Sequence, residues 1–180
     1  MYIWTAIDLG RQVDGIRKRA EAVCSEMGVD NPAFTLPSHI SLKISCEIDD
    51  RYFDEAVERL SEKFEETLPF EIKRDDIEQN GGIVWIKHFP SDKLQALHNF
   101  LVEFFRKYGC SEHIFDSDFA FHTSLYVGKA DVAEKIYEEI KNTDIPDRLT
   151  VESFIIGCSE TGLAGEYRVL KRINKAIIEE

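Results

Sequence analysis

Two short stretches of the sequence carry side chains that suit acid–base chemistry on a phosphate. Residues 37–44 read PSHISLKI, and their alternation of apolar and polar residues is typical of a half-buried β-strand. Alternate residues of a strand share a face, so His39, Ser41 and Lys43 are predicted to point together, away from the apolar side. A rise of about 3.3 Å per residue separates the Cα atoms of His39 and Ser41 by roughly 6–7 Å. This spacing suits an imidazole beside a reacting oxygen and a hydroxyl on a neighbouring phosphate oxygen.

The second stretch, residues 121–127, reads FHTSLYV and repeats the pattern. Here His122, Ser124 and Tyr126 are predicted to share one face, and the residues between them the other. Two His-x-Ser-Leu strands in one chain are the feature that the rest of the sequence has to position.

The order of predicted elements repeats around these two strands. Each half reads strand, helix, histidine strand, helix, strand, and one further strand follows the second half. The predicted helices cover about 11–27, 51–68, 91–108 and 131–141. The predicted strands other than the histidine strands cover about 2–8, 70–78, 83–88, 149–157 and 166–173. Equivalent positions keep a nearly constant offset: 81 residues from Trp4 to Trp85, and 83 from His39 to His122. This regularity indicates an internal duplication of one β-α-β-α-β unit.

The duplication predicts an α+β fold of two pseudo-symmetric lobes. We expect a single domain over residues 1–180, with lobe one at about 1–80, lobe two at about 81–180, and antiparallel sheets in both. The join near residues 80–82 has no features of a flexible linker, so the lobes should pack as one body. A pseudo-twofold axis would then bring both H-x-S motifs to one central cleft.

Composition limits the possible partners. A chain of 180 residues with 43% hydrophobic residues suffices for one globular core, and the net charge of −12 opposes binding of long nucleic acids. No apolar run reaches the length of a membrane span, and the N-terminus resembles a first strand rather than a signal segment. Cys24, Cys46, Cys110 and Cys158 are widely scattered, which favours reduced thiols and a cytoplasmic protein. We expect a monomer with no membrane partner.

The paired H-x-S motifs, about 80 residues apart, resemble those of the 2H phosphoesterase superfamily. Within it the resemblance is to the 2',5'-RNA ligase / 2',3'-cyclic phosphodiesterase group, and it covers nearly the whole chain. The segment WTAIDL at residues 4–9 is similar to the family's opening strand, and Ser159, Gly165 and Tyr167 fit its terminal stretch. Tyr2 and Tyr126 stand where the family often has arginine, which favours a small nucleotide over long RNA as the substrate.

The resemblance implies a metal-independent phosphoesterase that hydrolyses a 2',3'-cyclic phosphate or a 2',5'-phosphodiester in a small nucleotide or an RNA end, with a place in RNA processing. Opening such a diester needs one proton taken from water and one given to the leaving ribose oxygen, and two histidines can supply both. His39 and His122 are therefore the expected catalytic pair. The expected substrate-binding residues are Ser41, Ser124, Lys43 and Tyr126.

Other functions are compatible with the same residues. A metal site needs three or four ligands, and His88, His98 and His113 have no ligand spacing around either motif, so we expect no metal and no cofactor. The alternatives are a 2',5'-RNA ligase, which would use the same groups in the reverse direction, and a nucleotide- or RNA-end-binding module with little turnover. The sequence does not decide which histidine is the base.

Overall fold

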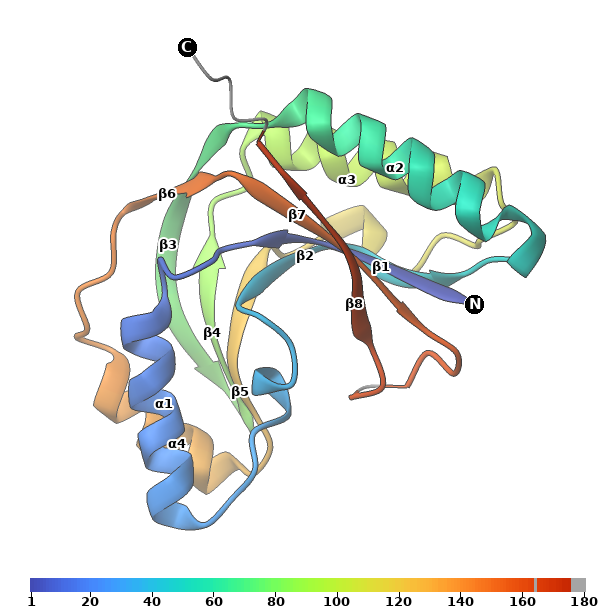
Figure 1. Cartoon of the computed structure of the whole chain (residues 1–180). Helices are drawn as coiled ribbons and strands as arrows, with labels where there is room; N and C mark the ends of the chain where they lie inside the picture. Colours follow the sequence, from blue (N-terminus) through green and yellow to red (C-terminus); the bar gives the residue numbers. More distant parts are fainter. Residues whose placement is uncertain (164, 176–180) are drawn as a thin grey trace.

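Over the residues that the structure describes, the apolar alternation produces eight strands in two antiparallel sheets (Figure 1). The computed structural model describes residues 1–163 and 165–175. The first sheet has the order β2-β1-β7-β8, formed by His39–Glu47, Tyr2–Asp8, Ser153–Ser159 and Arg168–Asn174. The second has the order β5-β4-β3-β6, formed by His122–Val127, Ile83–His88, Phe70–Asn80 and Arg148–Val151. The predicted α+β fold of two antiparallel lobes is confirmed.

Four amphipathic helices cover the two sheets in pairs. They are α1 at Asp14–Met27, α2 at Phe53–Thr67, α3 at Asp92–Arg106 and α4 at Ala130–Ile140. Helices α1 and α4 pack on each other and against the second sheet, whereas α2 and α3 lie over the first (Figure 1). Three single-turn helices, η1 (Pro32–Phe34), η2 (Asp50–Tyr52) and η3 (Asp116–Asp118), lie in the connections. Over the described ranges, none of the helices combines the length and apolarity that a membrane crossing needs.

Each sheet takes strands from both halves of the sequence. The last strand of the first half, β3, pairs with β4, and β7 from the second half pairs with β1. The division into sheets therefore does not follow the sequence division at about residue 80. Residues 176–180 of the expected second lobe lie outside the described residues.

The predicted strand at 149–157 is wrong in one respect, because it is two strands in different sheets. Val151 of β6 pairs with Phe70 in the second sheet, whereas Phe154 of β7 pairs with Ile7 in the first. The chain changes sheets at Glu152, which belongs to neither strand. A continuous apolar pattern cannot reveal this, because both segments are buried against the same core.

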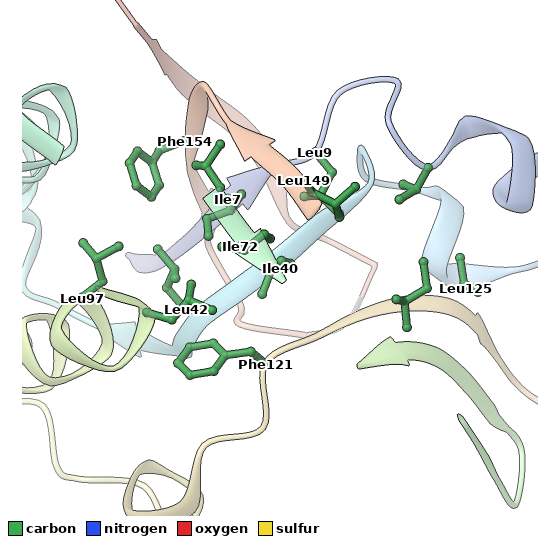
Figure 2. Packing of buried hydrophobic residues seen from close by; sticks show 14 of the residues in the cluster. Ile7, Leu9, Ile40, Leu42, Ile72, Leu97, Phe121, Leu125, Leu149 and Phe154 are labelled. Atoms are coloured by element: carbon green, nitrogen blue, oxygen red, sulfur yellow. The ribbon is translucent and has the colours of Figure 1, made fainter. Parts of the chain in front are cut away.

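One continuous core lies between the two lobes. Figure 2 shows Ile7 and Ile40 of the first sheet close to Ile72 of the second, and all three belong to a single buried cluster. Leu42 and Leu125, which follow the serines of the two motifs, are buried in the same cluster. The histidine strands thus rest on shared packing, which fixes them relative to each other.

Two of the four cysteines form a disulfide. Cys46 at the end of β2 and Cys110 after α3 form a disulfide with Cα atoms 6.1 Å apart, whereas Cys24 and Cys158 are free and buried. The prediction of four reduced thiols is therefore corrected. The two partners are 64 residues apart, and only the packing of α3 beside β2 brings them together.

Candidate active site

His39 begins β2 and is held by the backbone just before it. Its Nδ1 lies 2.8 Å from the carbonyl oxygen of Pro37, so Nδ1 carries a proton and donates it to that oxygen. Its ring meets the Trp4 indole edge-on, with ring centroids 4.6 Å apart. This fixes the ring orientation and leaves Nε2 as the nitrogen that can exchange a proton with a substrate.

His122 begins β5 and repeats this arrangement. Its Nδ1 lies 2.9 Å from the carbonyl oxygen of Ala120, again two residues upstream. Trp85 is its aromatic neighbour, at a centroid distance of 6.0 Å. The two motifs therefore share not only sequence but also the tautomer that the backbone selects.

The two imidazoles affect each other electrostatically. Burial lowers the pKa of His39, and the positive charges of His122 and Arg17 lower it further, while the hydrogen bond to Pro37 and the carboxylate of Asp8 oppose this. The net result is a pKa below the ordinary value, which favours the neutral imidazole at His39. The structure thus brings the two predicted histidines within electrostatic reach of each other, from the neighbouring strands β2 and β5.

The two serines lie where the motifs predict, each half-buried on the face of its histidine. The Ser41 hydroxyl accepts a hydrogen bond of 3.0 Å from the Trp4 indole N–H. Since that bond uses a lone pair of the oxygen, the hydroxyl proton of Ser41 is available for a phosphate oxygen. Ser124 lies opposite Trp85 in the pairing of β4 with β5.

The prediction for Lys43 is corrected, because this side chain points into the core. Ser41 pairs with Ala6 and Lys43 with Thr5, so β2 has one extra residue between these two pairs, a β-bulge at Leu42. The bulge turns two successive residues, Leu42 and Lys43, to the buried face, and Lys43 is only 3% exposed.

Inside the core, Lys43 belongs to a buried polar cluster. Its Nζ lies 2.9 Å from Oδ2 of Asp116, which also accepts a hydrogen bond from the His113 amide. Burial alone would raise the pKa of Asp116, but these two hydrogen bonds, together with the charges of Lys43 and His98, outweigh it and lower that pKa. His98 completes the cluster, with its ring nitrogens 2.8 Å from the Leu42 carbonyl oxygen and 2.9 Å from that of Asp116. Lys43 is therefore placed to hold the connection before β5, not to contact a substrate.

The prediction for Tyr126 is also corrected, because a β-bulge turns this side chain into the core as well. Val84 pairs with Tyr126 and Trp85 with Ser124, so β5 has its own bulge at Leu125. Tyr126 is consequently turned inward and is 1% exposed, and its hydroxyl accepts a hydrogen bond of 3.0 Å from the Lys129 amide. The bulges occupy equivalent positions in both halves, so the duplication extends to the irregularities of the strands.

Some residues of the site are not part of either motif. Trp4 contacts both His39 and Ser41. The sequence signal that could have revealed its role is that Trp4 and Trp85 occupy equivalent positions in the two halves. Arg17 of α1 donates hydrogen bonds to the Ser38 hydroxyl and to two carbonyl oxygens of the loop before β2. That interaction depends on how a helix packs against a loop, and no sequence pattern indicates it.

A buried histidine lies behind the second motif. His88, at the end of β4, has Nε2 2.9 Å from the hydroxyl oxygen of Thr123 and is 1% exposed. Burial lowers the pKa of His88 to about 3, with further contributions from the charges of His122 and Arg74. His88 is therefore neutral near pH 7 and supports β5 from the core side. Across the part of the chain that the structure describes, no three His, Cys, Asp or Glu side chains are grouped as metal ligands would be.

The fold and the paired H-x-S strands define the 2H phosphoesterase class, and comparison with known proteins agrees. The profile of the 2'-5' RNA ligase superfamily matches residues 8–157. The match includes both motifs and most of the chain. This chain therefore belongs to the 2'-5' RNA ligase superfamily.

Solved structures share the architecture at low sequence identity. LigT of E. coli, crystallised with 3'-AMP, is 19% identical over 96% of this chain and 97% of its own, with a TM-score of 0.60. TT0787 of Thermus thermophilus is 17% identical over 97% of each chain, with a TM-score of 0.57. Among the curated proteins, no sequence matches this chain. The structural matches establish a common fold over almost the full length.

Proposed function

We propose that this protein is a phosphoesterase that opens a 2',3'-cyclic phosphate or cleaves a 2',5'-phosphodiester at a small nucleotide or RNA end. The observation that carries the proposal is the duplicated orientation of His39 and His122. Each donates from Nδ1 to a carbonyl oxygen two residues upstream, which leaves each Nε2 for proton transfer. Two imidazoles prepared in this way fit a reaction that takes up one proton and releases another.

In the proposed reaction the two histidines have different roles. Neutral His39, whose pKa is lowered, removes a proton from water through Nε2 as the water attacks phosphorus. His122, in its protonated form, donates a proton to the ribose oxygen that leaves on the opposite side. Each such transfer is typically worth about 10²–10⁴ in rate. After one turnover the protonation states are exchanged, and solvent restores them.

The serines serve the phosphate itself. The hydroxyl protons of Ser41 and Ser124 are directed to the non-bridging oxygens, on which negative charge accumulates in the transition state. The Trp4 indole fixes the Ser41 oxygen in advance, so this donor is pre-oriented. Lys43 and Tyr126 have no part in this step, because both are buried in the core.

A small nucleotide is the expected substrate. The net charge of −12 opposes a long polyanion, and 3'-AMP in the related LigT structure is in keeping with a nucleotide ligand. A 5'-hydroxyl in place of the water would turn the same machinery to 2',5' ligation.

A panel assay tests the proposal. Purified protein is incubated with 2',3'-cyclic nucleotides and with 2',5'- and 3',5'-linked dinucleotides, and the products are separated by chromatography. We expect turnover of the cyclic or 2',5'-linked compounds, no turnover of the 3',5'-linked ones, and loss of activity in His39→Ala. Nucleotide binding without any turnover would instead identify a binding module and overturn the proposal. Prolonged chelation should leave the rate unchanged, because the proposed roles need only protein side chains.

A further inference from the structure

Two adjoining hollows lie beside the first motif, at the end of β1. One has a volume of about 460 Å³ and is lined by Pro37 and Ser38, the residues that immediately precede His39. The other, of about 1050 Å³, extends toward Thr150 and Lys175. They share Asp8, Gly10, Arg11 and Arg172, so they form one continuous depression.

Three arginines from separate parts of the chain converge on the smaller hollow. Arg11 precedes α1, Arg17 lies within α1, and Arg172 belongs to β8. Two aspartates, Asp8 and Asp14, also line it, so the local balance is positive although the whole chain carries −12. A positive hollow on an acidic protein attracts a small anion at this place rather than a long polyanion over the surface.

The arginines differ in how strongly the protein already binds them. Arg17 is committed to the loop before β2, with hydrogen bonds of 3.0–3.1 Å to Ser38 and two carbonyl oxygens. Arg172 is ion-paired through one nitrogen with Asp8, which holds its guanidinium at the rim with other N–H groups available. The Arg11 side chain is exposed, and among the residues that the structure describes no carboxylate pairs with it.

The hollow is built rather than incidental. Asp8 is 5% exposed, and its carboxylate accepts a hydrogen bond of 2.9 Å from the Gly10 amide, in a turn where Gly10 has a φ of 54°. That positive φ suits glycine and lets the chain double back between β1 and α1. Arg11 therefore leaves a fixed turn, beside a fixed ion pair, just after the end of β1, the strand that pairs with β2.

The hollow also faces the proposed chemistry. Asp8 is the pairing partner of His39 between β1 and β2, so the floor of the hollow and the histidine are neighbours across the sheet. We propose that this hollow is a second anion subsite, which binds one additional phosphate of a substrate whose reacting phosphate lies between His39 and His122. The inference rests on the proposed function and narrows its substrate class to nucleotides with a further phosphate. That phosphate is either a 5'-monoester or the next phosphodiester of an oligonucleotide end.

Three substrates test the subsite and separate these two sources. They are adenosine 2',3'-cyclic phosphate, its 5'-phosphorylated form, and the dinucleotide ApA with a terminal 2',3'-cyclic phosphate. In the unmodified protein, the matching extra phosphate should raise kcat/KM by about tenfold or more, the scale of one charge-assisted hydrogen bond. The 5'-phosphorylated nucleotide gains if the subsite takes a monoester, and the dinucleotide gains if it takes a diester.

Arg11→Gln is the decisive variant, and Arg19→Gln is its matched control. Arg19 lies on α1, is exposed, and pairs with Glu139 away from the hollow. We expect Arg11→Gln to reduce the advantage of the extra phosphate to near unity and Arg19→Gln to preserve it. An equal ratio in the unmodified protein and Arg11→Gln, or no advantage for either phosphorylated substrate, overturns the subsite.

A binding measurement separates failure of this inference from failure of the proposed function. Calorimetric titration with adenosine 3',5'-bisphosphate and with 3'-AMP needs no turnover. Tighter binding of the bisphosphate that disappears in Arg11→Gln supports the subsite even if no substrate is hydrolysed. Equal affinities for the two nucleotides count against a monoester subsite, and the dinucleotide arm then decides between a diester subsite and none.

Discussion

The half-sites around His39 and His122 have the same backbone and different surroundings. Both histidines donate from Nδ1 to a carbonyl oxygen two residues upstream, and both strands have a bulge after the serine. His39, however, packs closely against Trp4 and lies near two charged side chains, Arg17 and Asp8. The comparison shows how a duplicated scaffold can keep the backbone geometry constant while burial and the neighbouring charges lower the pKa of one imidazole, that of His39.

The aromatic neighbours illustrate the same divergence. The indole N–H of Trp4 donates to Ser41 within the motif, whereas that of Trp85 donates to Glu78 on β3, at 3.3 Å. Among the residues that the structure describes, a tryptophan therefore holds the motif serine in the first half-site and not in the second. We infer that the half-sites are not interchangeable, although their sequences suggest it.

The largest expected effect comes from removing the histidines. His39→Ala and His122→Ala should each lower kcat by orders of magnitude, because each removes one proton transfer. The double variant should lose much less than the product of the two single losses, since the two groups act as a unit. Single-turnover rates on a 2',3'-cyclic nucleotide measure this. Full activity of His122→Ala beside an inactive His39→Ala would contradict a two-histidine mechanism.

Substitutions of Lys43 and Tyr126, which the bulges turn into the core, should differ strongly in their effect on the free energy of unfolding. Lys43→Met leaves the Asp116 carboxylate buried without its partner and should lower the free energy of unfolding by about 3–5 kcal/mol. Tyr126→Phe removes only a hydroxyl that accepts one hydrogen bond, at a cost of about 1 kcal/mol. Urea denaturation measures both.

A paired variant provides the control for Lys43. Replacing both charges, in Lys43→Met with Asp116→Asn, should recover much of the loss, because no unpaired charge then remains buried. If Lys43→Met were as stable as the unmodified protein but inactive, Lys43 would act on the substrate and its assignment to the core would be wrong.

His88, buried behind the second motif, predicts a pH dependence of stability. Its pKa of about 3 in the folded state lies below the unfolded value of about 6.5, so between these values the unfolded state binds the extra proton. The stabilisation is complete above pH 6.5 and falls as the pH decreases toward 3, by at most about 1.4 kcal/mol per pH unit. Denaturation midpoints of His88→Gln should depend less on pH in this window, whereas the exposed His113→Gln should behave as the unmodified protein does.

The smallest expected effect concerns the charge beside His39. The Asp8 carboxylate raises the pKa of His39, so Asp8→Asn should lower that pKa further. The acidic limb of the rate profile, where His39 gains its proton, should move to lower pH by a fraction of a unit, and the alkaline limb should stay in place. Asp14→Asn is the control, because Asp14 is not among the groups that shift the pKa of His39. A shift of the alkaline limb instead would assign His39 as the acid.

Sequence reasoning located the histidines and serines because their strands keep strict alternation up to the serine. It failed two residues later, at Lys43 and Tyr126, because the bulge between the serine and each of these residues adds a residue without altering the apolar pattern. After a bulge at which two successive residues face the core, an alternation-based prediction assigns the following side chains to the wrong face of the strand. The duplication did not expose the error, since the same bulge occurs in both copies.

Other features depended on contacts between distant parts of the chain. The pairing of Cys46 with Cys110, the hold of Arg17 on the loop before β2, and the change of sheet at Glu152 all arise from packing between elements. Sequence periodicity describes one helix or strand at a time. It therefore predicted the individual elements well, but not which elements pack against or pair with one another.

The exchange of strands between the halves has a consequence for how such a protein can arise. The last strand of each half pairs with the first strand of the other half, because β3 pairs with β4 and β7 with β1. Two separate copies would satisfy each other by swapping that strand, and the resulting homodimer would carry one histidine from each subunit. Joining the copies through the turn at residues 80–82 makes the dimer permanent and frees each half to mutate independently. Unequal half-sites are possible in a single chain, whose halves can differ in sequence. They are impossible in a symmetric homodimer, because its two subunits have the same sequence.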